Sequence, residues 1–328
     1  MVSDLNWDDL GVGRAGVLSS RRVTGLSEQV IAELVAEVGP VWQARQDARL
    51  SERPWRRAPG AGAKYKLVFV DRLLATLVHL RHGSTHDVLA AWFGVDRSTI
   101  TRAIHEIRPL LADRGCRVEQ GIRLRTVADV VAYLDTVRQT ALMDATEIRV
   151  RRPTIKRAGR HQFISGKSRQ NAMKALMITD AQGRVLFCGA TARGSTADIT
   201  QARQAGVPDW LEHTMAVEIL TDAGYQGLGA QTCGQVLTPT LRHHKKRLAR
   251  MPGIAELRAE QRKSYARRRV RVEHGIAHLK NWRSLARHLG RRDNLDDTVR
   301  AVAGLLSDHQ RIDRPQRKPI AALTAAAM

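Results

Sequence analysis

Three acidic residues lie where a carboxylate is costly unless it has a partner. Asp144 interrupts an apolar run, Asp222 ends a second apolar run, and Glu273 stands among arginines in a long basic segment. Removing an ionised carboxylate from water without a compensating cation is unfavourable. The three residues are separated by 78 and 51 positions, so only the fold can bring them together.

Three carboxylates that converge repel one another, and a divalent cation relieves this repulsion. Hard oxygen ligands with no His or Cys beside them favour Mg²⁺ or Mn²⁺. Two such ions about 3.5–4 Å apart hold the attacking and leaving oxygens of a phosphodiester. Taken singly, each acid has an ordinary alternative, as a turn former or as the ion-pair partner of a nearby arginine. Other acids compete for the same role: Asp135, Glu147, Asp180, Asp198, Glu218 and Glu256.

The charge balance predicts a polyanionic partner. The 328 residues include 54 Lys and Arg against 32 Asp and Glu, a net charge of +22, which suits DNA, RNA or an anionic membrane. Aromatic residues make up only 4% of the chain, which disfavours the aromatic-anchored helix that membrane binding needs. Of the cations 44 are Arg, and the planar Arg fork suits phosphate and guanine, although a GC-rich genome also favours arginine.

The same composition predicts a cytoplasmic protein. No stretch approaches the ~18 uninterrupted apolar residues of a membrane span. Asp4, Asp8 and Asp9 stand where a signal peptide needs a basic and then apolar leader. The three cysteines are far apart, so neither a disulfide framework nor zinc-ligand spacing is expected.

Residues 61–125 have the pattern of a helical DNA-binding domain. Apolar residues at helical spacing run to Gly83, Thr85 caps a short helix that ends at Gly94, and Asp96 caps a third helix. Two helices joined by a tight turn predict a helix-turn-helix unit, with an ordinary three-helix bundle as the alternative. The outward side chains that face base edges in this interpretation are Arg97, Ser98, Thr101, Arg102 and His105.

Residues 138–290 switch to strand patterns followed by a long helix. We predict a strand over 141–150, a hairpin of 172–180 and 184–190, a short strand over 217–225 and a basic helix over about 256–289. This order indicates an α/β (α+β) domain. Residues 1–60 are expected to form an N-terminal helical segment, with a helix from about Ser27 to Val38 and a linker over 51–64, and 291–328 a C-terminal tail.

From about residue 55 to 290 the chain resembles bacterial insertion-sequence transposases of the DDE type, close to the Harbinger-like group. The DNA-binding unit of that family is similar to LVHLRHGSTHDVLAAWFGVDRSTITRAIHEI. Its catalytic motifs resemble, in order, MDATEIRV, FISGKSRQNAMKALMITDAQGRVLF, ARGSTADI, LTDAGYQGL and ARRRVRVEHGIAHLKNWR. Ala145 stands where the family commonly has Gly, and Ala197 stands where it has His.

The resemblance implies a ribonuclease-H-like catalytic domain, with a mixed sheet and the third acid on a helix. Asp144, Asp222 and Glu273 would be the metal ligands, with two Mg²⁺ or Mn²⁺ ions as cofactor. Arg269 and Lys280 lie one to two turns from Glu273 on the same helical face, where they would hold phosphate. Asp198 would support the site without binding metal.

The implied activity is cleavage at the element ends followed by joining of the freed 3′-OH to target DNA. The implied partners are terminal inverted repeats and target DNA, bound by a homodimer in a synaptic complex in the bacterial nucleoid. Basic runs at 149–160 and 242–250 would follow the DNA backbone, with solvated loops as the alternative. A non-catalytic helix-turn-helix regulator, or a domesticated metal-dependent nuclease without strand transfer, remains open.

Overall fold

The computed structural model describes residues 20–52, 66–119, 121–156, 158–214, 216–240 and 252–312. Most of the predicted linker at 51–64 and all of the basic run at 242–250 lie outside these ranges. Within them, no helix combines the length and the apolar character that crossing a membrane requires.

The N-terminal part is helical, as predicted. Ser27 caps the long helix α3 by accepting a hydrogen bond from the Val30 amide. The predicted end at Val38 is wrong: α3 continues through Pro40, because its buried face continues with Trp42, which packs on Phe69 with ring centroids 5.5 Å apart. The helices here are α2 (Arg21–Thr24), α3 (Glu28–Ser51), α4 (Phe69–His82), α5 (His86–Phe93) and α6 (Arg97–Asp113).

Helices α4, α5 and α6 form the predicted helix-turn-helix region. Gly83 and Gly94 end α4 and α5 in the left-handed conformation, with φ of 66° and 62°, which glycine adopts without strain. The Thr85 hydroxyl caps α5 by accepting from the Val88 amide. Leu74, Leu89, Ile100 and Ile104 are among the apolar residues that pack these helices together.

The second part of the chain contains a mixed sheet of six strands in the order β5-β4-β3-β6-β7, with β8 also paired to β3. The pairs β3–β4 and β4–β5 are antiparallel, and β3 pairs in parallel with β6 and β8. The predicted strand over 217–225 shrinks to two residues. The strands are β3 (Ala141–Val150), β4 (Ala172–Asp180), β5 (Val185–Arg193), β6 (Ile219–Leu220), β7 (Val236–Leu237) and β8 (Arg287–His288).

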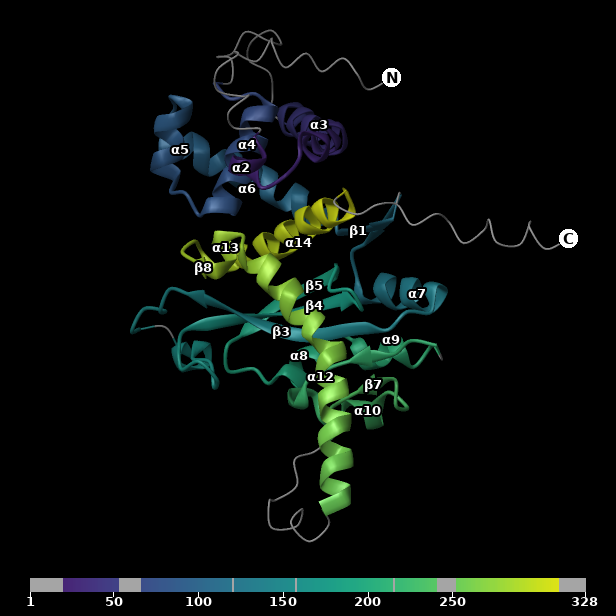
Figure 1. The fold of residues 1–328 in the computed structure, drawn as a ribbon. Coiled ribbons are helices and arrows are strands. Elements are labelled where there is room, and N and C mark those ends of the chain that lie inside the picture. Colours follow the sequence, from purple (N-terminus) through teal and green to yellow (C-terminus); the bar gives the residue numbers. More distant parts are fainter. Residues whose placement is uncertain are drawn as a thin grey trace, which may run out of the picture.

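Helices cover both faces of this sheet. Successive strand side chains point to opposite faces, and Leu142 and Ile148 of β3 belong to one apolar core while Ala141 and Met143 belong to another. The first core includes residues of α12 (Pro252–Lys280), α13 (Arg283–Ala286) and α14 (Leu295–Ile312); the second includes residues of α7 (Val127–Val137), α8 (Asp198–Gln204) and α9 (Val207–Leu211). Figure 1 shows the sheet between these groups and α12 crossing it. The mixed sheet and the crossing helix agree with the expected ribonuclease-H-like α/β class.

Shorter elements complete the described chain. They are the hairpin β1 (Cys116–Glu119) with β2 (Ile122–Leu124), the helix α10 (Leu228–Gln231), and the single turns η2 (Arg160–Phe163), η3 (Ala223–Tyr225) and η4 (Arg292–Asn294). The turn η3 directly follows Asp222, whose side chain caps it.

The segment predicted as a C-terminal tail contains a core helix. Leu295, Val299, Val302 and Leu306 of α14 are buried, at the spacing of one helical face. Helix α14 contacts both α6 of the helix-turn-helix and β5 of the sheet. It therefore joins the helix-turn-helix region to the sheet.

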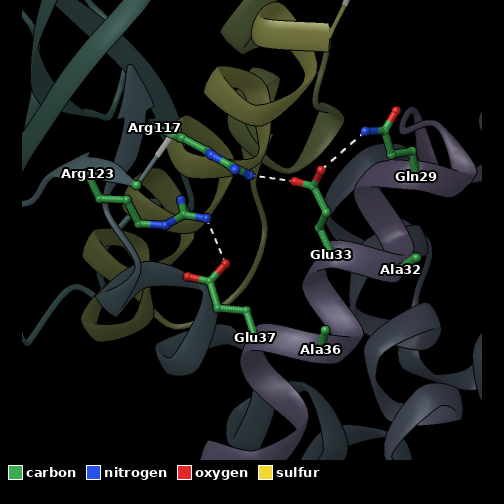
Figure 2. A pocket seen from close by; sticks show the side chains of 8 residues that line it. Gln29, Ala32, Glu33, Ala36, Glu37, Arg117 and Arg123 are labelled. Carbon is green, nitrogen blue, oxygen red and sulfur yellow. Dashed lines mark hydrogen bonds and ion pairs between the residues drawn. The ribbon is translucent and has the colours of Figure 1, made fainter. Parts of the chain in front are cut away.

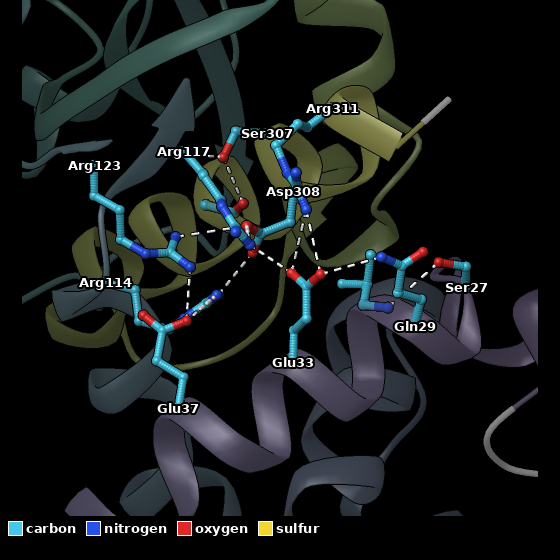
Figure 3. Close-up of polar contacts among 12 residues, drawn as sticks. Ser27, Gln29, Glu33, Glu37, Arg114, Arg117, Arg123, Ser307, Asp308 and Arg311 are labelled. Carbon is cyan, nitrogen blue, oxygen red and sulfur yellow. Dashed lines mark hydrogen bonds and ion pairs between the residues drawn. The ribbon is translucent and has the colours of Figure 1, made fainter. Parts of the chain in front are cut away.

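A network of ion pairs fastens α3 to the hairpin and to α14. Asp308 and Arg114, whose side chains are 2% and 5% exposed, lie 2.9 Å apart, and Arg114 also donates to Glu37 at 2.7 Å. Figure 3 shows how the side chains converge from α3, the end of α6, the β1–β2 hairpin and α14. The network comprises Glu33, Glu37, Arg114, Arg117, Arg123, Asp308 and Arg311.

Beside this network lies a cavity of about 570 Å³. Its charged lining is paired internally: Glu33 accepts from Arg117 at 2.5 Å, and Glu37 accepts from Arg123 at 2.6 Å (Figure 2). The remaining lining includes the small side chains of Ala32 and Ala36. Because its charged groups already have partners, this cavity is part of the structural junction.

Candidate active site

Asp144 lies in the middle of the central strand. It pairs in register with Met177 of β4, and its side chain is 14% exposed. Burial raises the pKa of Asp144 to about 6, against the attraction of Arg269, and the nearby Asp222 raises it further. The carboxylate accepts a hydrogen bond of 2.8 Å from the Ala145 amide. A carboxylate that is hard to ionise in the free protein is suited to binding a cation.

Asp222 follows β6, whose parallel pairing with β3 brings the two acids together. The Asp222 carboxylate accepts from the Gly224 amide at 2.8 Å, which fixes the turn after the strand. Tyr265 of α12 holds the residue before it: the tyrosine hydroxyl lies 2.7 Å from the carbonyl oxygens of Thr221 and Leu237 and accepts from the Thr221 amide at 3.1 Å. The helix is thereby tied to the strand ends beside the acid.

The third acid comes from α12, which lies close against the β4–β5 turn. A Cβ at Gly275 would stand 2.8 Å from the Gly183 carbonyl oxygen, and one at Gly183 would stand 2.4 Å from the Arg271 carbonyl oxygen. Only glycine permits this approach. The contact sets the height of the helix over the sheet, and so where Glu273 lies relative to Asp144.

The guanidinium of Arg269 lies among the three acids. Its Nη2 is 3.3 Å from Asp144 Oδ2 and 3.3 Å from Glu273 Oε1, and its Nη1 is 3.9 Å from Asp222 Oδ2. The Arg269 side chain is 15% exposed and that of Glu273 is 61% exposed. The three predicted ligands are thus brought together around one cation, and Arg269, predicted to hold phosphate, contacts carboxylates in this structure.

Asp198 lies beside Asp222. A Cβ at Gly224 would lie 3.0 Å from Asp198 Oδ2 and 3.0 Å from Asp222 Oδ1. Asp198 also pairs with Lys174 of β4 at 2.8 Å. Glycine at position 224 therefore leaves a space between two carboxylates, and Lys174 supplies one local counter-charge.

The hydroxyl of Tyr225 is buried without a hydrogen-bond partner in the described part of the chain. Burial raises the pKa of Tyr225, and the negative charges of Asp144, Asp198 and Asp222 raise it further. A buried hydroxyl costs about 1–3 kcal/mol when it is left unpaired. The hydroxyl therefore lies within electrostatic reach of the three acids, and no described group of the protein satisfies it.

These residues fit a divalent cation in their chemistry. As the side chains now lie, no group of three or more His, Cys, Asp and Glu among the described residues is arranged to hold a metal ion. Arg269 occupies the place between the carboxylates, and the space at Gly224 and the unpaired Tyr225 hydroxyl lie beside it. An all-oxygen, multiply negative donor set selects Mg²⁺ or Mn²⁺.

Lys280 lies further along α12. Burial lowers its pKa, while Glu147 raises it and Lys167 lowers it. Glu147, a competitor in the sequence, accepts hydrogen bonds from Ser165 at 2.5 Å and Ser168 at 2.8 Å. Its oxygens are therefore occupied in holding the loop after η2.

The predicted DNA-contacting residues of α6 form one outward patch. Arg97 lies 3.5 Å from Asp87, with both side chains about two-thirds exposed. Arg102 donates to the Ser98 hydroxyl at 3.4 Å, and Thr101 lies 2.8 Å from His86 Nδ1. The sequence did not single out His86, which is the first residue of α5.

Three further site residues escaped the sequence analysis: Lys174, Tyr225 and Tyr265. Tyr265 stands four residues before Arg269, so helical spacing places the two on one face, which was a usable signal. Lys174 faces Asp198 only because the hairpin and α8 meet in space.

The structure thus defines a helix-turn-helix joined to a mixed sheet with convergent acids. A family model described as helix-turn-helix of DDE superfamily endonuclease matches residues 65–117, and one described as DDE superfamily endonuclease matches residues 143–307. The second match spans half of the chain, which therefore belongs to the DDE superfamily endonucleases. The resemblance to DDE-type insertion-sequence transposases is confirmed.

The chain is also similar to the proposed transposase of insertion sequence element IS112 from Streptomyces albus G. The two are 25% identical over 263 residues, which cover 80% of this chain and 83% of that protein. Two solved structures of Mos1, a paired end complex of mariner Mos1 with Mg and a strand transfer complex, match at 12% identity. They cover 74% and 83% of this chain and 85% and 86% of theirs, at TM-scores of 0.19 and 0.20. At such scores the likeness supports no argument.

Proposed function

We propose that this protein is a DNA transposase that cleaves phosphodiesters at the ends of its element and joins the freed 3′-OH to target DNA. The convergence of Asp144, Asp222 and Glu273 around one cation is the observation that carries the proposal. The family match supports endonuclease chemistry, and the similarity to the IS112 protein supports a role in transposition.

Asp144, Asp222 and Glu273 would hold two Mg²⁺ or Mn²⁺ ions. These ions would activate the attacking oxygen and stabilise the leaving oxygen in each in-line displacement. The three residues come from β3, the end of β6 and α12, so the sheet and the crossing helix hold the ligands in place. Asp198 with Lys174 supports the turn that carries Asp222, without coordinating metal.

Arg269 and Lys280 would contribute to DNA binding at this site. Arg269 pairs with the acids in the structure and would pair with a scissile phosphate once metal neutralises them. Lys280 stands on the same side of α12 and would hold the neighbouring phosphate.

The helix-turn-helix would recognise the terminal inverted repeats. Arg97, Ser98, Thr101 and Arg102 lie at the N-terminal half of α6, where recognition helices meet base edges. Inverted repeats occur in pairs, so the working assembly would be a homodimer that holds both ends in a synaptic complex. A nucleoid location in the bacterial cytoplasm follows from this role.

Two other functions predict different results. A DNA-binding regulator needs no acidic cluster, and a domesticated nuclease would cleave without joining ends. The like-charged acids of the sheet and α12 favour an enzyme over a regulator, because a regulator gains nothing from their mutual repulsion.

The test is Mg²⁺-dependent cleavage and joining with supercoiled DNA that carries the element ends. Asp222→Asn retains an oxygen to accept from the Gly224 amide but removes the charge, so it should fold and bind DNA without cleaving. Asp209→Asn, an exposed acid on α9, is the matched control and should cleave normally. Cleavage without joined products would indicate a nuclease. Binding without cleavage by the unaltered protein would favour the regulator.

A further inference from the structure

Helix α12 continues well beyond the sheet that it crosses. Figure 1 shows its N-terminal half projecting on the side of the sheet away from α4, α5 and α6. Leu257 on this half is 60% exposed, so even an apolar side chain lies largely in solvent there. From Glu256 to Arg268 every described side chain is exposed or half-exposed.

One face of this helix carries a basic stripe that runs through the active site and consists of Arg258, Arg262, Arg269 and Lys280. At 3.6 residues per turn, Arg258 and Arg262 fall within about 20° of Arg269 around the helix axis, and Lys280 falls there too. Glu256 and Glu260 fall roughly on the opposite side. The helix is therefore basic on the face that begins at the acids and continues outward past the sheet.

These arginines are not engaged in holding the protein together. Within the part of the chain that the structure describes, neither Arg258 nor Arg262 has a carboxylate at ion-pair distance. By contrast, Arg268 pairs with Glu218 at 2.6 Å, and Arg269 pairs with the site acids. Two unpaired guanidiniums at (i, i+4) repel each other, which an anionic partner would relieve.

We propose that Arg258 and Arg262 bind the DNA backbone outside the element end, namely the flanking DNA before cleavage and the target DNA afterwards. This rests on the proposed function. The helix-turn-helix and the projecting half of α12 lie on opposite sides of the sheet whose strand β3 carries Asp144. A duplex held by α6 on one side of the cleaved bond would continue on the other side along Arg262 and Arg258.

The dimensions agree with this path. A helix rises 1.5 Å per residue, so the eleven steps from Arg269 to Arg258 span about 16 Å. Phosphates along one strand are about 3.4 Å apart in axial rise, so the stripe reaches roughly five nucleotides past the cleaved bond. DNA is the chosen partner because the stripe is continuous with the site where DNA would be cut.

The experiment compares two duplexes that carry the element end, bound to the full chain in EDTA so that no cleavage occurs. One stops at the cleavage point and the other continues for about 15 bp, one and a half turns of B-DNA. The double variant R258Q/R262Q is compared with K263Q/R267Q, which removes the same charge from exposed positions on the other side of the helix. Affinity is measured by fluorescence anisotropy at several salt concentrations.

The unaltered protein and K263Q/R267Q are expected to bind the longer duplex more tightly. R258Q/R262Q is expected to lose this gain, about tenfold, and its salt slope on the longer duplex should fall by about 1.8, or 0.9 per lost phosphate contact. Its affinity for the shorter duplex should be unchanged.

The proposal would be overturned if both double variants lost affinity equally, or if R258Q/R262Q lost as much affinity for the shorter duplex as for the longer one. It would also be overturned if flanking DNA did not raise the affinity of the unaltered protein. Circular dichroism confirms that the variants are folded. The outcome is separate from that of the proposed function: a stripe-dependent gain without Mg²⁺-dependent cleavage would leave the DNA path standing and reject the enzyme.

Discussion

Two charged clusters in this protein are built in opposite ways. The network around Asp308 sets four guanidiniums against three carboxylates, with its central pair almost fully buried. The site around Arg269 sets three carboxylates against one guanidinium, and Glu273 remains largely exposed. The first cluster pairs each carboxylate with at least one guanidinium and has one positive charge in excess, whereas the second has an excess of negative charge.

The difference separates a structural role from a functional one. Removing one partner from a buried ion pair leaves the other charge buried without a counter-charge, which lowers stability. Removing one acid from a cluster of like charges relieves repulsion. The same chemical change, Asp to Asn, should therefore have opposite effects on stability and on activity in the two clusters.

The largest effect is expected from Asp144→Asn on catalysis. Loss of this carboxylate should reduce Mg²⁺-dependent cleavage on the order of 10⁴-fold, as removal of a central catalytic group does. The free energy of unfolding should stay equal or rise, since Asp144 is buried beside Asp222. Cleavage assays and urea denaturation measure the two quantities. Retained cleavage would contradict the proposed site.

Asp308→Asn should do the reverse. It leaves Arg114 buried without its full counter-charge, and breaking such a pair costs about 3–5 kcal/mol of unfolding free energy. Urea denaturation measures the loss, with Asp297→Asn as a control, because Asp297 is partly exposed and pairs with Arg300. Cleavage per folded molecule at low temperature should be nearly normal. A loss below ~1 kcal/mol would show that the network does not hold the junction.

Asp144 should also make stability depend on pH when no metal is present. Burial raises its pKa from 3.8 to about 6, so between these values the folded protein binds a proton that the unfolded chain releases. Stability from this group is full below about pH 4 and decreases as the pH rises to about 6, by at most about 3 kcal/mol. Asp144→Asn should remove this dependence. An unchanged pH profile in the variant would refute it.

The smallest effect is expected at Arg269. Arg269→Gln removes the cation that stands between the acids, and the DNA-free protein should bind Mn²⁺ several-fold more tightly, about 1 kcal/mol. Arg268→Gln removes the same charge from the adjacent position, where the guanidinium pairs with Glu218, and should change affinity less. Titration calorimetry measures both. Equal affinities in the two variants would show that Arg269 does not compete with the ion.

Local signals predicted much of the fold. The strand over 141–150 and the first strand of the hairpin, 172–180, have the predicted bounds, because apolar runs and a Gly turn are encoded nearby in sequence. Helix α3 runs past the predicted end at Val38 and through Pro40, and the packing of Trp42 on Phe69 that accompanies this is not encoded in any local pattern. Helix α14 was assigned to a tail, although its apolar residues recur at helical spacing.

The site was predictable only in part. Asp144, Asp222 and Glu273 were singled out by their apolar or basic surroundings, and the resemblance ranked them above their competitors. That Arg269 contacts all three acids depends on the height of α12 over the sheet, which Gly183 and Gly275 set. Tyr265 holds the Thr221 amide through a contact 44 residues apart, which no local pattern encodes. The metal-binding role of the acids itself stays a prediction.

Helix α14 determines how far α6 lies from the acidic site. Since it contacts both α6 and β5, the helix predicted to contact DNA and the sheet that carries the acids pack against the same helix. If the proposed function holds, this spacing fixes the number of base pairs between the sequence that α6 binds and the bond that is cut. The position of the cut would then follow the spacing within the protein, and moving the recognised sequence along the DNA would move the cut with it.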